Sequence, residues 1–313
     1  MGAAVITSAT AGIGATGMNT IMTVLADTFL GVKRNRGPIL RYCNTAGEGV
    51  GVPHGTVRFM VPPAGTTPID ATDGTGPAYD DTIAVSKDVT LSVHKSVRFG
   101  FSQIEQTLGG GRDIGPVTAG RMADLFNSIE ADVVSLAATF TTNTGGTGNT
   151  DVSMAAIDAM RTKLVAHQVP AGDPLYAVWA ARTYGWSAVS NLPDFKEYRI
   201  RGEMGGSFDP TKEYGVVPVY YKGIYHFESQ NVYYSTYTYN MMWHKDAILV
   251  AMKAPVIPTS KNVEAMNFKD PESGIEFQIL KFWDLATNAD AIEIHSLYGK
   301  ALGREDWGGY ILS

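Results

Sequence analysis

The stretch PVTAGRMADLFNSIEADVVSLAATF, residues 116–140, predicts the longest element of the chain and frames the interpretation of the rest. Its apolar side chains recur at alternating steps of four and three residues, at Met122, Phe126, Ile129, Val133, Leu136 and Phe140. This spacing indicates an amphipathic helix with one apolar stripe. Pro116 suits the first turn, and Gly145 and Gly146 favour an end before them. At about 1.5 Å per residue, the helix would be roughly 36 Å long.

The composition indicates a folded protein with room for two or three subdomains. Of the 313 residues, 44% are hydrophobic and 10% aromatic, which is enough to build more than one core. The net charge of −6 argues against a surface that attracts nucleic acid as a whole. A basic run at residues 33–36, together with Arg41, is interpreted as a solvated or subunit-facing patch.

Cys43 is the single cysteine, which excludes an intrachain disulfide and a cysteine metal cluster. It fits synthesis in a reducing cytoplasm. No apolar run is long enough to cross a bilayer, and the first residues lack the charged start and apolar core of a secretory signal. We therefore expect a soluble protein without a membrane partner.

Gly12, Gly14 and Gly17 match the dinucleotide-binding pattern G-x-G-x-x-G. That pattern requires a buried strand before it, a helix opening on it, and an acidic residue about 20 positions later. Only residues 3–6 could form the strand, and basic residues occupy the place of the acid. A lone glycine pattern is weak evidence. A nucleotide-dependent oxidoreductase is therefore the less favoured alternative, and we expect no cofactor.

The first hundred residues predict segments that extend away from the folded core. Residues 18–32 can form a short amphipathic helix, and glycines break any periodicity over residues 36–53. Residues 56–61 predict one strand, and alternating residues 83–101 predict a second. A two-stranded projection is marginal when isolated in water. We therefore expect it, and the apolar start of the chain, to lie on a neighbouring subunit.

The later sequence predicts an α+β pattern. One helix is expected to start at a cap on Asp151 or Ser153 and to run through residue 169, and another is expected at residues 182–192. Residues 245–253 fit either a buried strand or a helical turn. Short strands rich in β-branched and aromatic residues are expected at residues 175–180, 214–221, 224–227, 232–239, 263–268, 276–281, 291–296 and 310–312.

No motif of a catalytic or metal site is evident. The phosphate loop, the nucleophile elbow and the zinc helix are absent. The aspartates of residues 70–81 depart from the calcium-loop pattern. The histidines are dispersed in sequence and are interpreted as surface or structural residues: His54, His94, His167, His226, His244 and His295. The tyrosine-rich residues 220–239 are interpreted as packing, because few basic residues are interleaved for base stacking.

The order of these elements resembles that of the major capsid proteins of tailed bacteriophages, which have the Hong-Kong-97-type fold. Residues 89–105 look like the strand of the extended loop that returns toward the spine helix, and residues 119–140 are similar to the spine helix itself. Residues 240–251, NMMWHKDAILVA, resemble a coat-protein segment in which asparagine and histidine precede an Asp-Ala step. Residues 297–312 fit the usual ending of such chains.

The resemblance implies an α+β capsid fold with an N-terminal arm, an extended two-stranded loop, a long spine helix, and peripheral and axial domains. The arm would span residues 1–50 and the loop residues 51–100. The peripheral domain would comprise residues 101–148, which hold the spine helix at about 116–140, and residues 256–295. The axial domain would comprise residues 149–255 and 296–313.

The function that the resemblance implies is structural and not enzymatic. Hexamers and pentamers of the chain would form an icosahedral virion shell around packaged double-stranded DNA, assembled in the host bacterial cytoplasm. An acidic chain suits a shell that makes no sequence-specific DNA contacts. The implied partners are a portal protein and a separate scaffolding protein, since the segment before the arm is short. A decoration protein is a further candidate partner, and no lysine–asparagine cross-link is expected.

Within the same fold, an encapsulin-like nanocompartment shell around a cargo enzyme remains an alternative. In either shell, apolar faces that one copy covers poorly would be buried between copies. We expect Phe99 and Phe101 to anchor the root of the loop. Four residues of the long helix are expected to hold it on the late strands: Met122, Phe126, Ile129 and Val133.

Overall fold

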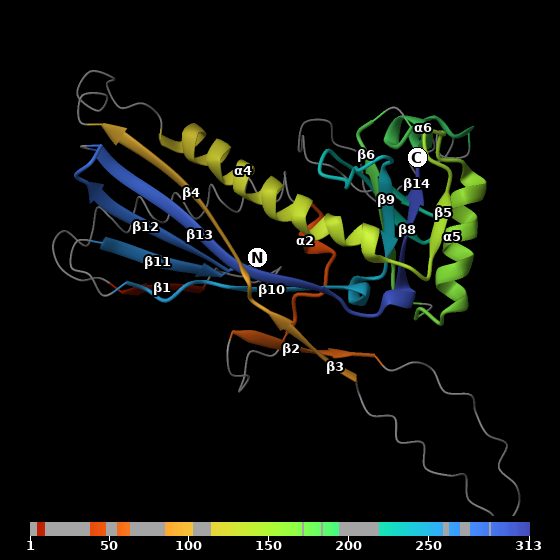
Figure 1. Cartoon of the computed structure of the whole chain (residues 1–313), viewed down its shortest axis with the longest axis horizontal. Coiled ribbons are helices and arrows are strands. Elements are labelled where there is room, and N and C mark those ends of the chain that lie inside the picture. The colour runs from red at the N-terminus through yellow and green to blue at the C-terminus, as the bar shows by residue number, and fades with distance from the viewer. Residues whose placement is uncertain are drawn as a thin grey trace, which may run out of the picture.

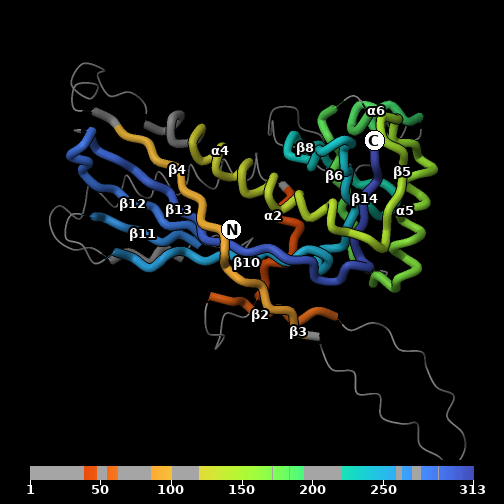
Figure 2. Tube along the Cα trace, viewed as in Figure 1, coloured from red at the N-terminus to blue at the C-terminus, as the bar shows by residue number. Residues whose placement is uncertain are grey.

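The computed structural model describes residues 5–9, 38–47, 55–62, 85–102, 114–170, 172–182, 184–193, 219–258, 263–269, 276–287 and 289–313. Figures 1 and 2 show two sheets connected by a long helix. The helix, α4 (Ile114–Val134), crosses one face of the first sheet and ends beside the second. The observed architecture is the mixed α+β arrangement that the sequence predicts.

The first sheet is antiparallel throughout. Its order is β1-β11-β12-β13-β10, and β4 pairs with the other edge of β13. The long strand β13 (Ala289–Leu302) is the centre of this sheet, because β12, β10 and β4 all pair with it. The other strands are β1 (Val5–Ala9), β4 (Val93–Ser102), β10 (Ile248–Lys253), β11 (Val263–Lys269) and β12 (Glu276–Asp284).

The apolar stripe of α4 packs on this sheet. Phe126 is fully buried, and its ring meets Phe277 of β12 edge to face, with 5.3 Å between the centroids. Ile292 and Ile294 of β13 belong to the same core. The alternation of β13 explains the contact, since every second side chain faces the helix.

The predicted helix is confirmed over residues 116–134, but α4 ends six residues before the predicted end. A 3-10 helix, η1 (Ser135–Thr139), follows, and Phe140 is extended. The Ser135 hydroxyl donates to the Asp132 carbonyl (2.6 Å), and Lys300 also binds that carbonyl. Such side-chain bonds compete with the α-helical ladder, so the tighter turn begins here.

The second sheet has the order β5-β14-β9-β6-β8-β7. Two of its pairings are parallel, β14 with β5 and β6 with β8. Its strands are β5 (Thr144–Gly146), β6 (Leu175–Ala180), β7 (Val219–Tyr221), β8 (Ile224–Ser229), β9 (Tyr239–Trp243) and β14 (Gly308–Leu312). The helix α5 (Met154–Ala166) packs on it through Ile157, Met160 and Leu164, and α6 (Trp186–Asn191) adds Val189 to the same core (Figure 1).

A separate hairpin joins β2 (Thr56–Val61) to β3 (Val85–Thr90). The prediction of one strand over residues 83–101 is wrong, because Leu91 and Ser92 are not in a strand and separate two strands. The residues before the break pair with β2, and those after it form β4 and pair with β13. Only the first half therefore belongs to the hairpin.

Other sequence predictions are corrected in the same way. The strand predicted at residues 232–239 is wrong except at Tyr239, which begins β9, because the residues before it make only an isolated bridge between Tyr234 and Thr238. Thr238 exchanges two backbone hydrogen bonds with Ser313, which holds the segment as a loop. The helix predicted at residues 182–192 is shortened to α6. Residues 245–253 combine both alternatives, a 3-10 turn followed by β10.

The start of the chain also differs from the prediction. Residues 5–9 pair with β11 of the same chain, where a contact with a neighbouring subunit was expected. A short helix, α2 (Pro38–Arg41), lies in a stretch predicted to be irregular. The helix predicted at residues 18–32 lies outside the described residues.

Replacing Phe126 with alanine should destabilise the whole fold. The side chain is fully buried between α4 and β12, so the cavity should cost about 3–5 kcal/mol of unfolding free energy. Urea denaturation of the unassembled chain measures this, with Asp124→Ala on the exposed side of α4 as the control. Equal losses in the two variants would contradict the assignment of the buried face.

Candidate functional site

The residues predicted to anchor the loop root and the long helix lie around the layer between α4 and the first sheet. Each of the four helix residues has an exposed fraction of 0%: Met122, Phe126, Ile129 and Val133. Phe99 of β4 is 8% exposed and belongs to the same core. Phe101 pairs with Asp290 through the backbone, and its side chain lies outside the described residues. The role of these six residues in assembly stays a prediction.

Sequence reasoning missed the buried carboxylate beside this stripe. Glu130 is 0% exposed. Its Oε1 accepts the backbone N–H of Ile39 (3.1 Å), and its Oε2 accepts the side-chain amide of Asn231 (2.7 Å). Burial raises the pKa of Glu130 to about 7, although both hydrogen bonds act to lower it.

Glu130 therefore joins three segments that are distant in sequence. Ile39 belongs to α2, 91 residues earlier, and Asn231 lies in the loop after β8, 101 residues later. Both partners are neutral donors, so the carboxylate receives hydrogen bonds without an ion pair from either. A buried polar group of this kind stabilises only the arrangement that satisfies it.

The end of α4 is held on β13 by a second polar cluster. Asp132 accepts from Lys300 Nζ (2.7 Å) through one carboxylate oxygen and from the Tyr298 hydroxyl (2.8 Å) through the other. Although burial acts to raise the pKa of Asp132, these two hydrogen bonds hold it below its ordinary value. Burial and the same carboxylate raise the pKa of Tyr298.

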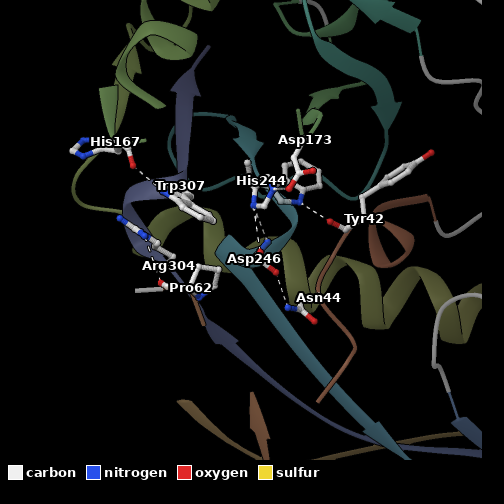
Figure 3. Close-up of polar contacts among 10 residues, drawn as sticks. Tyr42, Asn44, Pro62, His167, Asp173, His244, Asp246, Arg304 and Trp307 are labelled. Carbon is white, nitrogen blue, oxygen red and sulfur yellow. Dashed lines mark hydrogen bonds and ion pairs between the residues drawn. The ribbon is translucent and has the colours of Figure 1, made fainter. Parts of the chain in front are cut away.

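Besides α4, two shorter connections carry the chain from one sheet to the other, and they meet at one junction (Figure 3). One is η2 (Lys245–Ala247), between β9 and β10, and the other is η3 (Glu305–Trp307), between β13 and β14. They are joined by backbone bonds from Gly303 to Ala247 (2.9 Å) and from Arg304 to Asp246 (3.0 Å). A Cβ at Gly303 would lie 2.1 Å from the Asp246 carbonyl oxygen, so this approach requires glycine.

Side chains fasten other segments to the junction. The amide of Asn44 donates to Asp246 (2.7 Å), which docks the segment after α2. The indole of Trp307 donates to the carbonyl of His167 (2.9 Å) at the end of α5. Arg304 lies 4.4 Å from the Trp307 ring centroid and donates to the carbonyl of Pro62 after β2 (3.5 Å). Figure 3 shows these contacts converging from separate elements.

His244 at the junction has the geometry of a histidine–carboxylate pair. Its Nε2 lies 3.2 Å from Asp173, and its Nδ1 accepts the backbone N–H of Asp246 (3.3 Å). Because Nδ1 is an acceptor, the proton of a neutral ring lies on Nε2 and is donated to Asp173. Both nitrogens are thus used to cap η2 and to hold Asp173, and we interpret the pair as structural.

A metal cluster and a nucleotide site can both be compared with the described part of the chain. Within it, no group of three or more His, Cys, Asp or Glu side chains could hold a metal ion. Gly12, Gly14 and Gly17 lie outside the described residues. The strand before them, β1, is an antiparallel edge strand, whereas the dinucleotide motif follows a parallel strand. Among the described helices, none is both long and apolar enough to span a membrane.

The hairpin rests on the face of the first sheet opposite α4. Phe59 and Val89 are buried there against Leu249 of β10. A Cβ at Gly299 of β13 would lie 2.1 Å from the carbonyl oxygen of Thr90. The backbone of β3 therefore approaches β13 as closely as glycine permits, and this contact sets where the hairpin leaves the sheet.

Glu130→Gln should change how stability depends on pH. Unfolded Glu130 loses its proton near 4.5 and folded Glu130 near 7. Between these values the unfolded state binds fewer protons, so this residue's contribution to stability is lost as the pH rises. Glutamine does not titrate, so it removes this loss. Between pH 4.5 and pH 8, the unfolding free energy of the wild type should therefore fall by about 1–3 kcal/mol more than that of Glu130→Gln. Urea denaturation at both pH values measures this difference, with Asp124→Asn as the control. The prediction would be refuted if the unfolding free energy of Glu130→Gln changed with pH as much as that of the wild type.

Comparison with known proteins gives a match in structure but not in sequence. No family model matches the chain, and neither does any curated protein. A solved structure titled Mycobacterium phage Che8 has a TM-score of 0.52 and 15% identity, covering 88% of this chain and 90% of that one. The capsid of a native GTA particle gives 0.53 and 10%, covering 89% and 90%. The capsid of cyanophage P-SCSP1u gives 0.50 and 10%, covering 87% and 86%. Over nearly its whole length, the chain has the fold of phage capsid proteins.

Proposed function

We propose that this chain is the major capsid protein of a tailed bacteriophage. Its copies assemble as hexamers and pentamers into an icosahedral shell around double-stranded DNA. The observation that carries the proposal is the likeness in fold to capsid structures over most of both chains. The buried or half-buried side chains described above fit a structural role, because Glu130, Asp132 and His244 use their hydrogen-bonding atoms to hold segments together.

The proposal includes an assignment of the parts. The helix α4 is the spine helix, and the hairpin β2–β3 is the base of the extended loop. The first sheet forms the peripheral domain and the second sheet forms the axial domain. The strand β10 lies within residues 149–255, yet its backbone bonds belong to the first sheet. We therefore place the boundary of the axial domain at η2 and η3, where the chain crosses the junction.

Exposed apolar side chains support contact between copies. Met60 on the hairpin is 56% exposed. At one end of the first sheet, Leu285 in the turn after β12 is 86% exposed. Val256, in the segment that follows β10, is 91% exposed. Such side chains on extended parts of a chain are favourable when a neighbouring copy covers them. A shell in which the hairpin, the end of the sheet and the segment after β10 lie on other copies would bury them.

The proposed partners follow from the assembly. Copies of the chain are the main partner, with a portal protein, a separate scaffolding protein and, as a further candidate, a decoration protein. Packaged DNA is enclosed without sequence-specific contacts, which suits a net charge of −6. The proposed location is the virion capsid, assembled in the cytoplasm of the host bacterium.

Negative-stain microscopy tests the proposal on the protein expressed alone and with a scaffolding protein. Closed shells, tubes or sheets of hexamers are expected. A uniform small oligomer in both preparations would refute the proposal. The nucleic-acid content of particles purified from infected cells separates a genome shell from an encapsulin-like compartment, which would hold a protein cargo.

Gly299→Ala should impair assembly more than folding. The added methyl group meets the Thr90 carbonyl, so β3 must shift and the hairpin must leave the sheet at another angle. We expect a loss of about 1–3 kcal/mol in unfolding free energy and a large fall in the yield of closed shells. Gly120→Ala is the matched control, because its site on α4 has open space. Normal shells from Gly299→Ala would show that this contact does not orient the hairpin.

A further inference from the structure

Two histidines that are 201 residues apart in sequence meet on the first sheet. His94 of β4 and His295 of β13 approach to 3.1 Å between Nε2 and Nδ1, with nearly parallel rings. On β13, Ile292, Ile294 and Tyr298 belong to the core under α4. Since side chains alternate along a strand, His295 points to the opposite face. His94 itself is exposed.

A carboxylate fixes the orientation of one of these rings. Glu293 Oε2 lies 3.1 Å from His295 Nε2. Because a carboxylate accepts, the Nε2 proton is donated to Glu293, and the Nδ1 lone pair of His295 faces His94. The other oxygen of Glu293 lies 3.6 Å from Arg98 Nε, and Arg98 is also paired with Asp284 (2.6 Å). Arg98 and Glu293 therefore each have a partner of opposite charge.

This arrangement matches the surroundings of metal-binding histidines. Such histidines commonly donate their second ring N–H to a carboxylate, which fixes the tautomer and makes the ligating nitrogen more basic. Glu293 and His295 already stand in this relation. The two nitrogens share a hydrogen bond of 3.1 Å, and the ion would take the place of its proton. With metal–nitrogen distances of about 2.0–2.1 Å, nitrogens at this separation subtend an angle of about 100° at the ion. This angle lies close to the tetrahedral value.

We propose that His94 and His295 form a surface site for a divalent transition-metal ion, with Zn²⁺ as the natural candidate. His295 supplies Nδ1 and His94 supplies Nε2, whose proton moves to Nδ1 with no change in charge. Water completes the coordination, since no third His, Cys, Asp or Glu side chain among the described residues joins the two histidines in a metal-binding group. Imidazole nitrogen favours Zn²⁺, Ni²⁺ and Cu²⁺ over Mg²⁺ and Ca²⁺, which prefer oxygen.

Bound metal would fasten β4 to β13. These strands are already paired over Ala289–Tyr298, and β4 continues directly from the hairpin. A metal that binds only the folded arrangement stabilises it in proportion to its concentration. The site would therefore reinforce the place where the hairpin joins the sheet, whatever the assembly state of the chain.

Equilibrium dialysis with Zn²⁺ tests the site on the purified full-length chain. One ion per chain is expected, with a rise in the thermal midpoint that EDTA reverses and that Mg²⁺ does not reproduce. His94→Ala and His295→Ala should each abolish saturable binding, and Glu293→Gln should weaken it about tenfold. His167→Ala is the matched control and should bind as the wild type does.

The proposal fails if the wild type binds no Zn²⁺, or if His94→Ala and His295→Ala bind it as well as the wild type. X-ray absorption at the zinc edge provides a readout that does not depend on variants. Two imidazole ligands with water are expected, and a spectrum without imidazole would overturn the assignment. None of these measurements depends on shell formation, so their outcome is separate from that of the proposed function.

Discussion

The packing of α4 on the six-stranded sheet is the contact on which the rest of the structure depends. The helix covers one face of β11, β12 and β13 with an unbroken apolar stripe. The C-terminal end of this helix reaches the second sheet, so one rigid element sets the distance between the two sheets. Burial of large side chains such as Phe126 supplies the free energy, and the alternation of β13 determines which residues can meet the helix. A change in this layer would move both sheets.

Polar groups make that packing specific. Glu130 costs free energy when it is buried and charged, and the bonds from Ile39 and Asn231 offset part of the cost. The same bonds are available only when α2 and the loop after β8 are in place. Asp132 and Lys300 act similarly where the helix gives way to η1. The apolar stripe holds the layers together, and these carboxylates select one register among the arrangements that would bury it.

Elements with strong local patterns could be predicted from the sequence. The long helix, the Ser153-capped helix α5 and the strand β6 follow from periodicity and capping. The break at Leu91 could not be foreseen, because neither glycine nor proline marks it and the division depends on two different partner strands. Glu130 and the His94–His295 pair were missed for a related reason. Their partners lie 91 to 201 residues away, and local sequence carries no signal of such contacts.

The low identity to the capsid structures, 10–15%, is consistent with the nature of these constraints. The helix requires apolar side chains at given spacings, and leucine, methionine or phenylalanine can each meet that need. The strands require alternation in the same general way. Stricter demands fall on a few positions, such as Gly299 and Gly303, where another backbone occupies the space of a side chain. A fold that is specified mainly by pattern, with few fixed residues, can persist after sequence similarity has become too low to detect.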